Sequence, residues 1–132
     1  MTEPFRSAGR TLFSLGLVKG EEGNLSTFDG TTIVITRAGA PLSDLDVGNV
    51  VAGSLEQDLD DASSDLAVHR RLYRERGAGA IVHAHPPGTV SGEELVSGEH
   101  GVYVFASSLE RAVELAVSQA RKGKPSSQDT GR

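Results

Sequence analysis

Two stretches of the chain carry apolar residues at helical spacing, three or four positions apart. The first covers residues 4–18, with Gly16 near its predicted end. The second covers residues 107–121, where Ser107 and Glu110 predict a capping box at the start. The stripes consist of Phe5, Ala8, Leu12 and Leu15 in the first helix, and Leu109, Ala112, Val113, Ala116, Val117 and Ala120 in the second. The first helix is therefore expected to cover one face of a sheet, and the second presents a comparable stripe.

Short apolar runs between these helices predict strands, because they are bounded by turn residues and are rich in β-branched side chains. A hairpin is expected at Asp29-Gly30, since this pair supplies the positive φ angles of a tight primed turn. The acidic run 56–61 predicts a solvated loop. The predicted strands are 24–28, 31–36, 50–52, 80–85 and 102–105.

A third helix is predicted directly after Ser63-Ser64-Asp65. Its apolar and aromatic positions include Leu66, His69, Leu72 and Tyr73. The two serines supply a hydroxyl cap, and Asp65 is the acidic residue expected in the first turn. Free amides at a helix start, joined by two hydroxyls, also suit a phosphate group. The serines therefore either cap the helix or hold an anion.

Composition limits the possible classes of protein. The chain has 132 residues, which predicts one domain, here residues 1–121, followed by a disordered tail at 122–132. It contains no cysteine, which excludes disulfides and thiolate chemistry and fits the cytoplasm. A net charge of −5 argues against nucleic acid as the main partner. No signal sequence or membrane span is evident, so a soluble protein is expected.

Histidines are the strongest sign of chemistry in this chain. His83 and His85 end an apolar run, and alternation along a strand places both imidazoles on the same face. His100 precedes the last predicted strand and could approach them, and three imidazoles leave an open coordination position on a metal. Asp65 is a fourth candidate, as a metal ligand or a base. The alternatives are solvated histidines at a strand end, a loop residue at position 100, and an ordinary first-turn acid at position 65.

Five blocks of the sequence, in order, resemble the class II aldolase/adducin family. They are Gly23-Asn24-Leu25-Ser26; Ile35-Thr36-Arg37-Ala38-Gly39; Ser63-Ser64-Asp65 with His69 and Tyr73; Val82-His83-Ala84-His85-Pro86; and His100-Gly101-Val102 with Ser108-Leu109-Glu110-Arg111-Ala112. The resemblance implies a three-layer α/β/α sandwich with a mainly antiparallel central sheet. It also implies an aldolase or a 4-epimerase that binds zinc or another divalent metal, acts on a phosphorylated sugar and assembles as a homo-oligomer.

The resemblance assigns roles to particular residues. His83, His85 and His100 match the metal ligands, for which zinc is the expected ion. The residues that match the phosphate site are Asn24, Gly39, Ser63 and Ser64. Asp65 matches the acid that acts beside the metal. This chemistry is coherent, because a Lewis-acidic metal stabilises an enediolate while a carboxylate moves a proton.

The chain departs from the family pattern at two positions, in one shortened segment and in the lack of one tyrosine. Ala38 replaces a hydroxyl residue before the glycine, so one phosphate contact is lost. Asp65 replaces the glutamate of the aldolases, and aldolase and epimerase activities both stay open. Only residues 86–99 separate the second and third histidines, a shorter stretch than the family carries. Neither Tyr73 nor Tyr103 matches the proton-donating tyrosine that family enzymes keep near their C-terminus.

Two other interpretations compete with a metal-dependent lyase or epimerase. The first is a scaffold or metal-binding domain like the adducin branch, which keeps the fold without the enzyme site. The second takes His83-Ala84-His85-Pro86 with Ser91 and Glu94 as a metalloprotease site of the JAMM type. That assignment leaves Gly23-Asn24 and Ser63-Ser64 unexplained.

Overall fold

The computed structural model of the chain describes residues 3–19, 22–84, 95–98 and 101–123. Its centre is a six-stranded sheet with the order β3-β2-β1-β4-β6-β5. Every strand pairing in this sheet is antiparallel. The strands are β1 (Asn24–Phe28), β2 (Ile33–Thr36), β3 (Val50–Gly53), β4 (Gly79–Ala84), β5 (Leu95–Gly98) and β6 (Gly101–Ala106).

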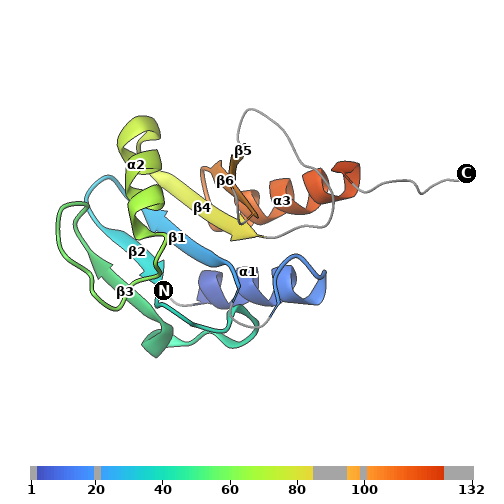
Figure 1. Cartoon of the computed structure of the whole chain (residues 1–132), viewed down its shortest axis with the longest axis horizontal. Helices are drawn as coiled ribbons and strands as arrows, with labels where there is room; N and C mark the ends of the chain where they lie inside the picture. The colour runs from blue at the N-terminus through green and yellow to red at the C-terminus, as the bar shows by residue number, and fades with distance from the viewer. Residues whose placement is uncertain (1–2, 20–21, 85–94, 99–100, 124–132) are drawn as a thin grey trace, which may run out of the picture.

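Helices cover both faces of the sheet (Figure 1). On one face, α1 (Glu3–Ser14) and α3 (Leu109–Gly123) bury an aliphatic core. On the other, α2 (Leu66–Arg76) packs over a smaller cluster rich in aromatic rings. The short helices η1 (Leu42–Asp44) and η2 (Val47–Asn49) lie between β2 and β3. The predicted α/β sandwich with an antiparallel sheet is confirmed.

Helix α1 ends earlier than its apolar spacing predicts. The last turn closes in a Schellman motif, with bonds from Leu17 N to Leu12 O (2.9 Å) and from Gly16 N to Phe13 O (3.1 Å). Gly16 takes the left-handed conformation that this motif requires, with φ of +76°. Leu15 consequently lies outside the buried stripe and is half exposed. The predicted extension of this helix to residue 18 is therefore wrong.

The hairpin between β1 and β2 is confirmed, but its turn is longer than Asp29-Gly30 suggests. Strand pairing ends at Phe28 and Ile33, which leaves residues 29–32 as the loop. Gly30 has a positive φ and Asp29 does not, so this pair does not form the type I′ turn that an Asp-Gly sequence predicts. The Asp29 carboxylate instead accepts hydrogen bonds from the next two threonine amides, at 2.8 and 2.7 Å. These side-chain bonds replace the tight backbone turn.

The caps of the other two helices also differ from the prediction. In α3, the Ser108 hydroxyl accepts a hydrogen bond from the Arg111 amide at 3.1 Å. The capping side chain is therefore Ser108, one residue after the predicted capping box of Ser107 with Glu110. In α2, Asp65 is the N-cap residue rather than a first-turn acid, and its side chain makes no capping bond. Its carboxylate is therefore available to other partners.

The C-terminal part of the chain brings two further corrections. The sequence predicts no strand where β5 lies, and α3 continues through Lys122 to Gly123, two positions that the sequence predicts to be part of the tail. The rest of that tail, from residue 124, lies outside the described residues. Within the described part of the chain, the helices are too short or too polar to cross a bilayer.

Candidate active site

The start of β1, the end of β4 and the residue before α2 meet on the face of the sheet that α2 covers. Asn24 begins β1 and lies opposite His83 in the register of β4. Asp65 stands directly before α2. Its Oδ2 atom lies 2.8 Å from Asn24 Nδ2 and 2.7 Å from His83 Nδ1. An asparagine, an aspartate and a histidine that are far apart in the sequence therefore share one hydrogen-bonded cluster.

The Asp65 carboxylate is ionised at neutral pH. Partial burial acts to raise its pKa, but hydrogen bonds from Asn24 and Tyr103 and the proximity of His83 together lower the pKa below its usual value. The side chain stays 27% exposed. Asp65 is thus a charged group that is held by donors on the protein side and still reaches solvent.

Tyr103 is a member of this cluster that the sequence analysis set aside. It pairs with His83 across β4 and β6, and the two rings stack with centroids 4.1 Å apart and an angle of 14°. Burial first, and then the Asp65 charge, raise the pKa of Tyr103 to about 12. The phenol therefore remains protonated and donates to Asp65. Only the strand register reveals this neighbour, and the sequence does not give that register.

A cavity of about 370 Å³ opens beside the cluster. Its lining includes all four residues that the sequence analysis placed at a phosphate site, together with the aspartate and one of the three histidines. The lining residues are Glu22, Gly23, Asn24, Arg37, Ala38, Gly39, Ser63, Ser64, Asp65 and His83. The structure therefore gathers residues from separate sequence blocks around one polar space.

Glycines shape the wall of this cavity. Gly39 follows β2 with φ of +76°, and Gly23 precedes β1 with φ of +82°. A Cβ atom on Gly23 would lie 2.7 Å from the backbone oxygen of His83, which is too close for any side chain. Glycine at this position thus lets the chain enter β1 directly against the end of β4.

The serines before α2 have different surroundings. Ser63 is buried, and its hydroxyl accepts from the Asp65 amide at 3.2 Å. This bond holds the turn that carries Asp65, so Ser63 performs part of the structural role expected of a cap. Ser64 is exposed at the cavity.

Two of the three predicted metal ligands, His85 and His100, lie outside the described residues. His83 is nearly fully buried. Among the residues that the structure describes, histidine and acidic side chains form no group of three that could bind a metal. The three-histidine site stays a prediction.

A second polar network lies behind the cluster, between β1 and α2. His69 contacts Asn24 Oδ1 through Nε2 and Ser26 Oγ through Nδ1, and Ser26 Oγ in turn contacts the Tyr73 hydroxyl. The sequence predicts no functional role for Ser26, His69 and Tyr73. The spacing of Asp65, His69 and Tyr73, which is four residues each time, places them on one face of a helix and could have indicated that His69 and Tyr73 lie near the site.

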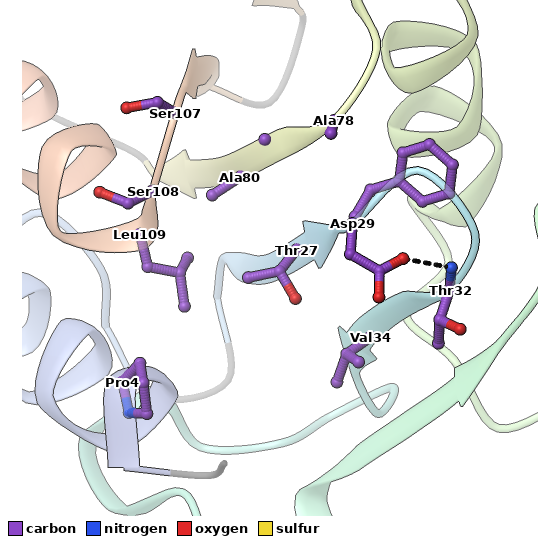
Figure 2. A pocket seen from close by; sticks show the side chains of 12 residues that line it. Pro4, Thr27, Asp29, Thr32, Val34, Ala78, Ala80, Ser107, Ser108 and Leu109 are labelled. Atoms are coloured by element: carbon purple, nitrogen blue, oxygen red, sulfur yellow. Dashed lines mark hydrogen bonds between the residues drawn. The ribbon is translucent and has the colours of Figure 1, made fainter.

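Another cavity, of about 670 Å³, lies on the opposite side of the sheet near the starts of α1 and α3 (Figure 2). Its lining is mostly apolar, with hydroxyls from Thr27, Ser107 and Ser108. The one ionisable side chain in its lining is Asp29, whose carboxylate is bound to the hairpin amides. The clustered aspartate, asparagine and histidine favour the smaller cavity as the active site.

Comparison with known proteins shows the family of the chain. The sequence matches the Class II Aldolase and Adducin N-terminal domain over residues 4–92. The chain therefore belongs to the class II aldolase and adducin family.

Two curated relatives carry functional names. A Rhodospirillum rubrum protein named 5-methylthioribulose-1-phosphate/5-deoxyribulose-1-phosphate aldolase is 36% identical over 84 residues, 61% of this chain and 38% of that protein. A Nocardia farcinica protein named "Probable bifunctional methylthioribose-1-phosphate isomerase/methylthioribulose-1-phosphate dehydratase" is 30% identical over 87 residues, 61% of this chain and 16% of that protein. The match thus covers well under half of either relative.

Solved structures share the fold over nearly the whole chain. The L-fuculose-1-phosphate aldolase of Thermus thermophilus superposes with a TM-score of 0.82 at 21% identity, covering 92% of this chain and 90% of that one. The L-fuculose 1-phosphate aldolase of Glaciozyma antarctica gives 0.71 at 12% identity, covering 92% and 70%. At such low identity these similarities establish the fold alone.

Proposed function

We propose that this protein is a metal-dependent lyase that acts on a small phosphorylated hydroxy-carbonyl compound. The observation that carries the proposal is the position of Asp65 between Asn24 and His83, at the cavity that Ser63 and Ser64 also line. The cavity thus combines a charged carboxylate with hydroxyl and amide donors. The names of the two curated relatives point to a ketose 1-phosphate as the substrate class.

The donor set around His83 fits a divalent metal such as zinc. Histidines that bind a metal through one ring nitrogen commonly donate the other N–H to a carboxylate, which fixes the ring and increases its basicity. His83 Nδ1 makes this contact with Asp65 at 2.7 Å. His83, His85 and His100 would hold the metal. When bound, the metal would polarise the substrate carbonyl and favour its enediolate form.

Asp65 is the proposed proton-transfer residue. It is ionised at neutral pH, reaches the cavity, and is oriented by donors from Asn24, His83 and Tyr103. A carboxylate oxygen can therefore accept a proton from a substrate hydroxyl or carbon, as retro-aldol cleavage, dehydration and epimerisation all require. The relatives' names favour cleavage or dehydration over epimerisation.

Asn24, Gly39, Ser63 and Ser64 are the proposed phosphate contacts. The chain has a net charge of −5, so an anionic substrate needs local donors to offset the overall repulsion. The exposed hydroxyl of Ser64, which lines the cavity, is such a donor. We also expect a homo-oligomer, which sedimentation of the purified protein would test.

Metal analysis and turnover together test this proposal. Protein purified without a histidine tag is expected to bind one divalent ion per chain, and the double variant His83→Ala/His85→Ala to bind none. Ketose 1-phosphates are then assayed with zinc, manganese or cobalt. Asp65→Asn should lower kcat by about 100-fold or more, because proton transfer by a positioned group contributes at least that much.

The possible results separate the alternatives. A chain that binds no metal would favour a scaffold that keeps the fold without the enzyme site. Metal binding without turnover would make the chain a metal-binding domain. Full activity in Asp65→Asn would remove Asp65 from the proton-transfer step.

A further inference from the structure

Four buried side chains connect the interior of the α2 layer to the active-site cluster. Tyr73, Ser26, His69 and Asn24 are each no more than 4% exposed. The Tyr73 hydroxyl lies 2.7 Å from Ser26 Oγ, and Ser26 Oγ lies 2.6 Å from His69 Nδ1. His69 Nε2 contacts Asn24 Oδ1, and Asn24 Nδ2 contacts Asp65 Oδ2. The proposed reaction uses Asn24 and Asp65 but assigns nothing to the other three residues.

The donor and the acceptor of each hydrogen bond in this series can be assigned by starting from Asp65. The Asp65 carboxylate can only accept, so the NH₂ group of Asn24 faces it and the amide oxygen points to His69. His69 Nε2 must therefore carry a hydrogen and donate to that oxygen. Burial lowers the pKa of His69 to about 3, so the ring is neutral and its Nδ1 is an acceptor. Ser26 donates to Nδ1 and accepts from Tyr73.

We propose that His69 is a positioning residue for the active site: as the Nε2–H tautomer, selected by Ser26 and Tyr73, it holds the Asn24 amide with its NH₂ group toward Asp65. The proposal rests on the proposed function, because it explains how the cluster around Asp65 keeps one arrangement. Had the amide turned over, its oxygen would face the Asp65 carboxylate and its NH₂ group would face the N–H of His69. Both contacts would then be repulsive.

The first test reads the tautomer directly and does not depend on turnover. Nuclear magnetic resonance of the imidazole nitrogens in the full-length chain, assigned with His69→Gln, is expected to show a protonated Nε2 and an unprotonated Nδ1. The same pattern should persist from pH 7.5 to pH 5.5. An Nδ1–H tautomer, or a ring that becomes charged within that range, would overturn the proposal even if the protein is an active lyase.

The second test asks whether the tautomer matters for the reaction. Ser26→Ala removes the donor to Nδ1, and Thr27→Ala is the matched control, since Thr27 is the next residue of β1 and lines the cavity on the other side of the sheet. Loss of a residue that orients an active-site group through a hydrogen bond commonly costs about 10–100-fold in activity. We expect Ser26→Ala to lower kcat by about tenfold or more with a KM within about threefold, and Thr27→Ala to change neither.

A further variant tests the same hydrogen bonds in case Ser26→Ala does not fold. Tyr73→Phe keeps the ring contacts with Phe28 and Phe105 and removes only the hydroxyl that orients Ser26. It should lower kcat in the same direction and increase the population of the Nδ1–H form. Wild-type kcat and tautomer in both Ser26→Ala and Tyr73→Phe would refute the positioning role. Equal kcat losses in Ser26→Ala and Thr27→Ala would show a structural role only and would also refute it.

Discussion

Burial of a neutral histidine makes the stability of this protein depend on pH. His69 is fully buried, and its pKa falls to about 3 from the ordinary value of 6.5. Between these two values the unfolded chain binds a proton at this residue and the folded chain does not. Acid therefore favours the unfolded state, so the stability contribution is complete above pH 6.5 and is lost as the pH falls toward 3.

The expected size follows from linkage. A single site that titrates only in the unfolded chain changes the free energy of unfolding by about 1.4 kcal/mol per pH unit. Relative to pH 7.5, His69 should cost about 1 kcal/mol at pH 5.5 and about 3 kcal/mol at pH 4.5. These values are a large part of the total stability of a small domain.

Urea denaturation of the wild type and of His69→Gln at pH 7.5, 5.5 and 4.5 measures this effect. Other titrating groups are common to the two proteins, so the difference between their pH dependences isolates His69. The variant is expected to be less stable at pH 7.5 and to lose less stability in acid. Parallel pH dependences in the two proteins would show that His69 is protonated in the folded state or is not buried.

Three other predictions test the packing and the cavity. Gly9→Ala would place a methyl group against a backbone carbonyl of η1 and should lower the free energy of unfolding by about 1–3 kcal/mol, whereas Gly48→Ala in an exposed turn should change it little. Leu12→Ala should cost about 2–5 kcal/mol in urea denaturation, because this side chain is fully buried, and a loss below about 1 kcal/mol would contradict the described core. The double variant Ser63→Ala/Ser64→Ala should weaken phosphate binding in calorimetry, and an unchanged response would remove both serines from the proposed phosphate site.

Hydrophobic periodicity predicted most of this fold. Among the described residues, helical spacing predicted the three α-helices but not η1 and η2, and short apolar runs predicted five of the six strands. The exception, β5, has only Leu95 and Val96 as apolar residues, too few to show a period. Helix ends were less predictable, because the Schellman bonds that stop α1 at Ser14 depend on backbone geometry rather than on the apolar stripe.

The site was predictable where its residues are close in the sequence. Ser63, Ser64 and Asp65 lie together before α2, and the resemblance to a family assigned them to one site with Asn24 and Gly39. The stacking of Tyr103 on His83 depends on how β4 pairs with β6, and a single sequence does not specify that register. The same is true of Ser26, whose contact with His69 requires α2 to pack over β1.

The pairing of Asn24 with His83 makes the candidate active site depend on two strands that are far apart in the sequence. Strands β1, β2 and β3 are neighbours along the chain, but the β1–β4 ladder joins segments separated by two further strands, two short helices and α2. Contacts between segments far apart in the sequence form slowly, because the chain loses the entropy of closing a long loop before the new contacts stabilise it. A shift of this ladder by one residue would also turn the His83 imidazole into the aliphatic layer beneath α1 and α3. Chains that pair these strands wrongly would therefore lack the site altogether.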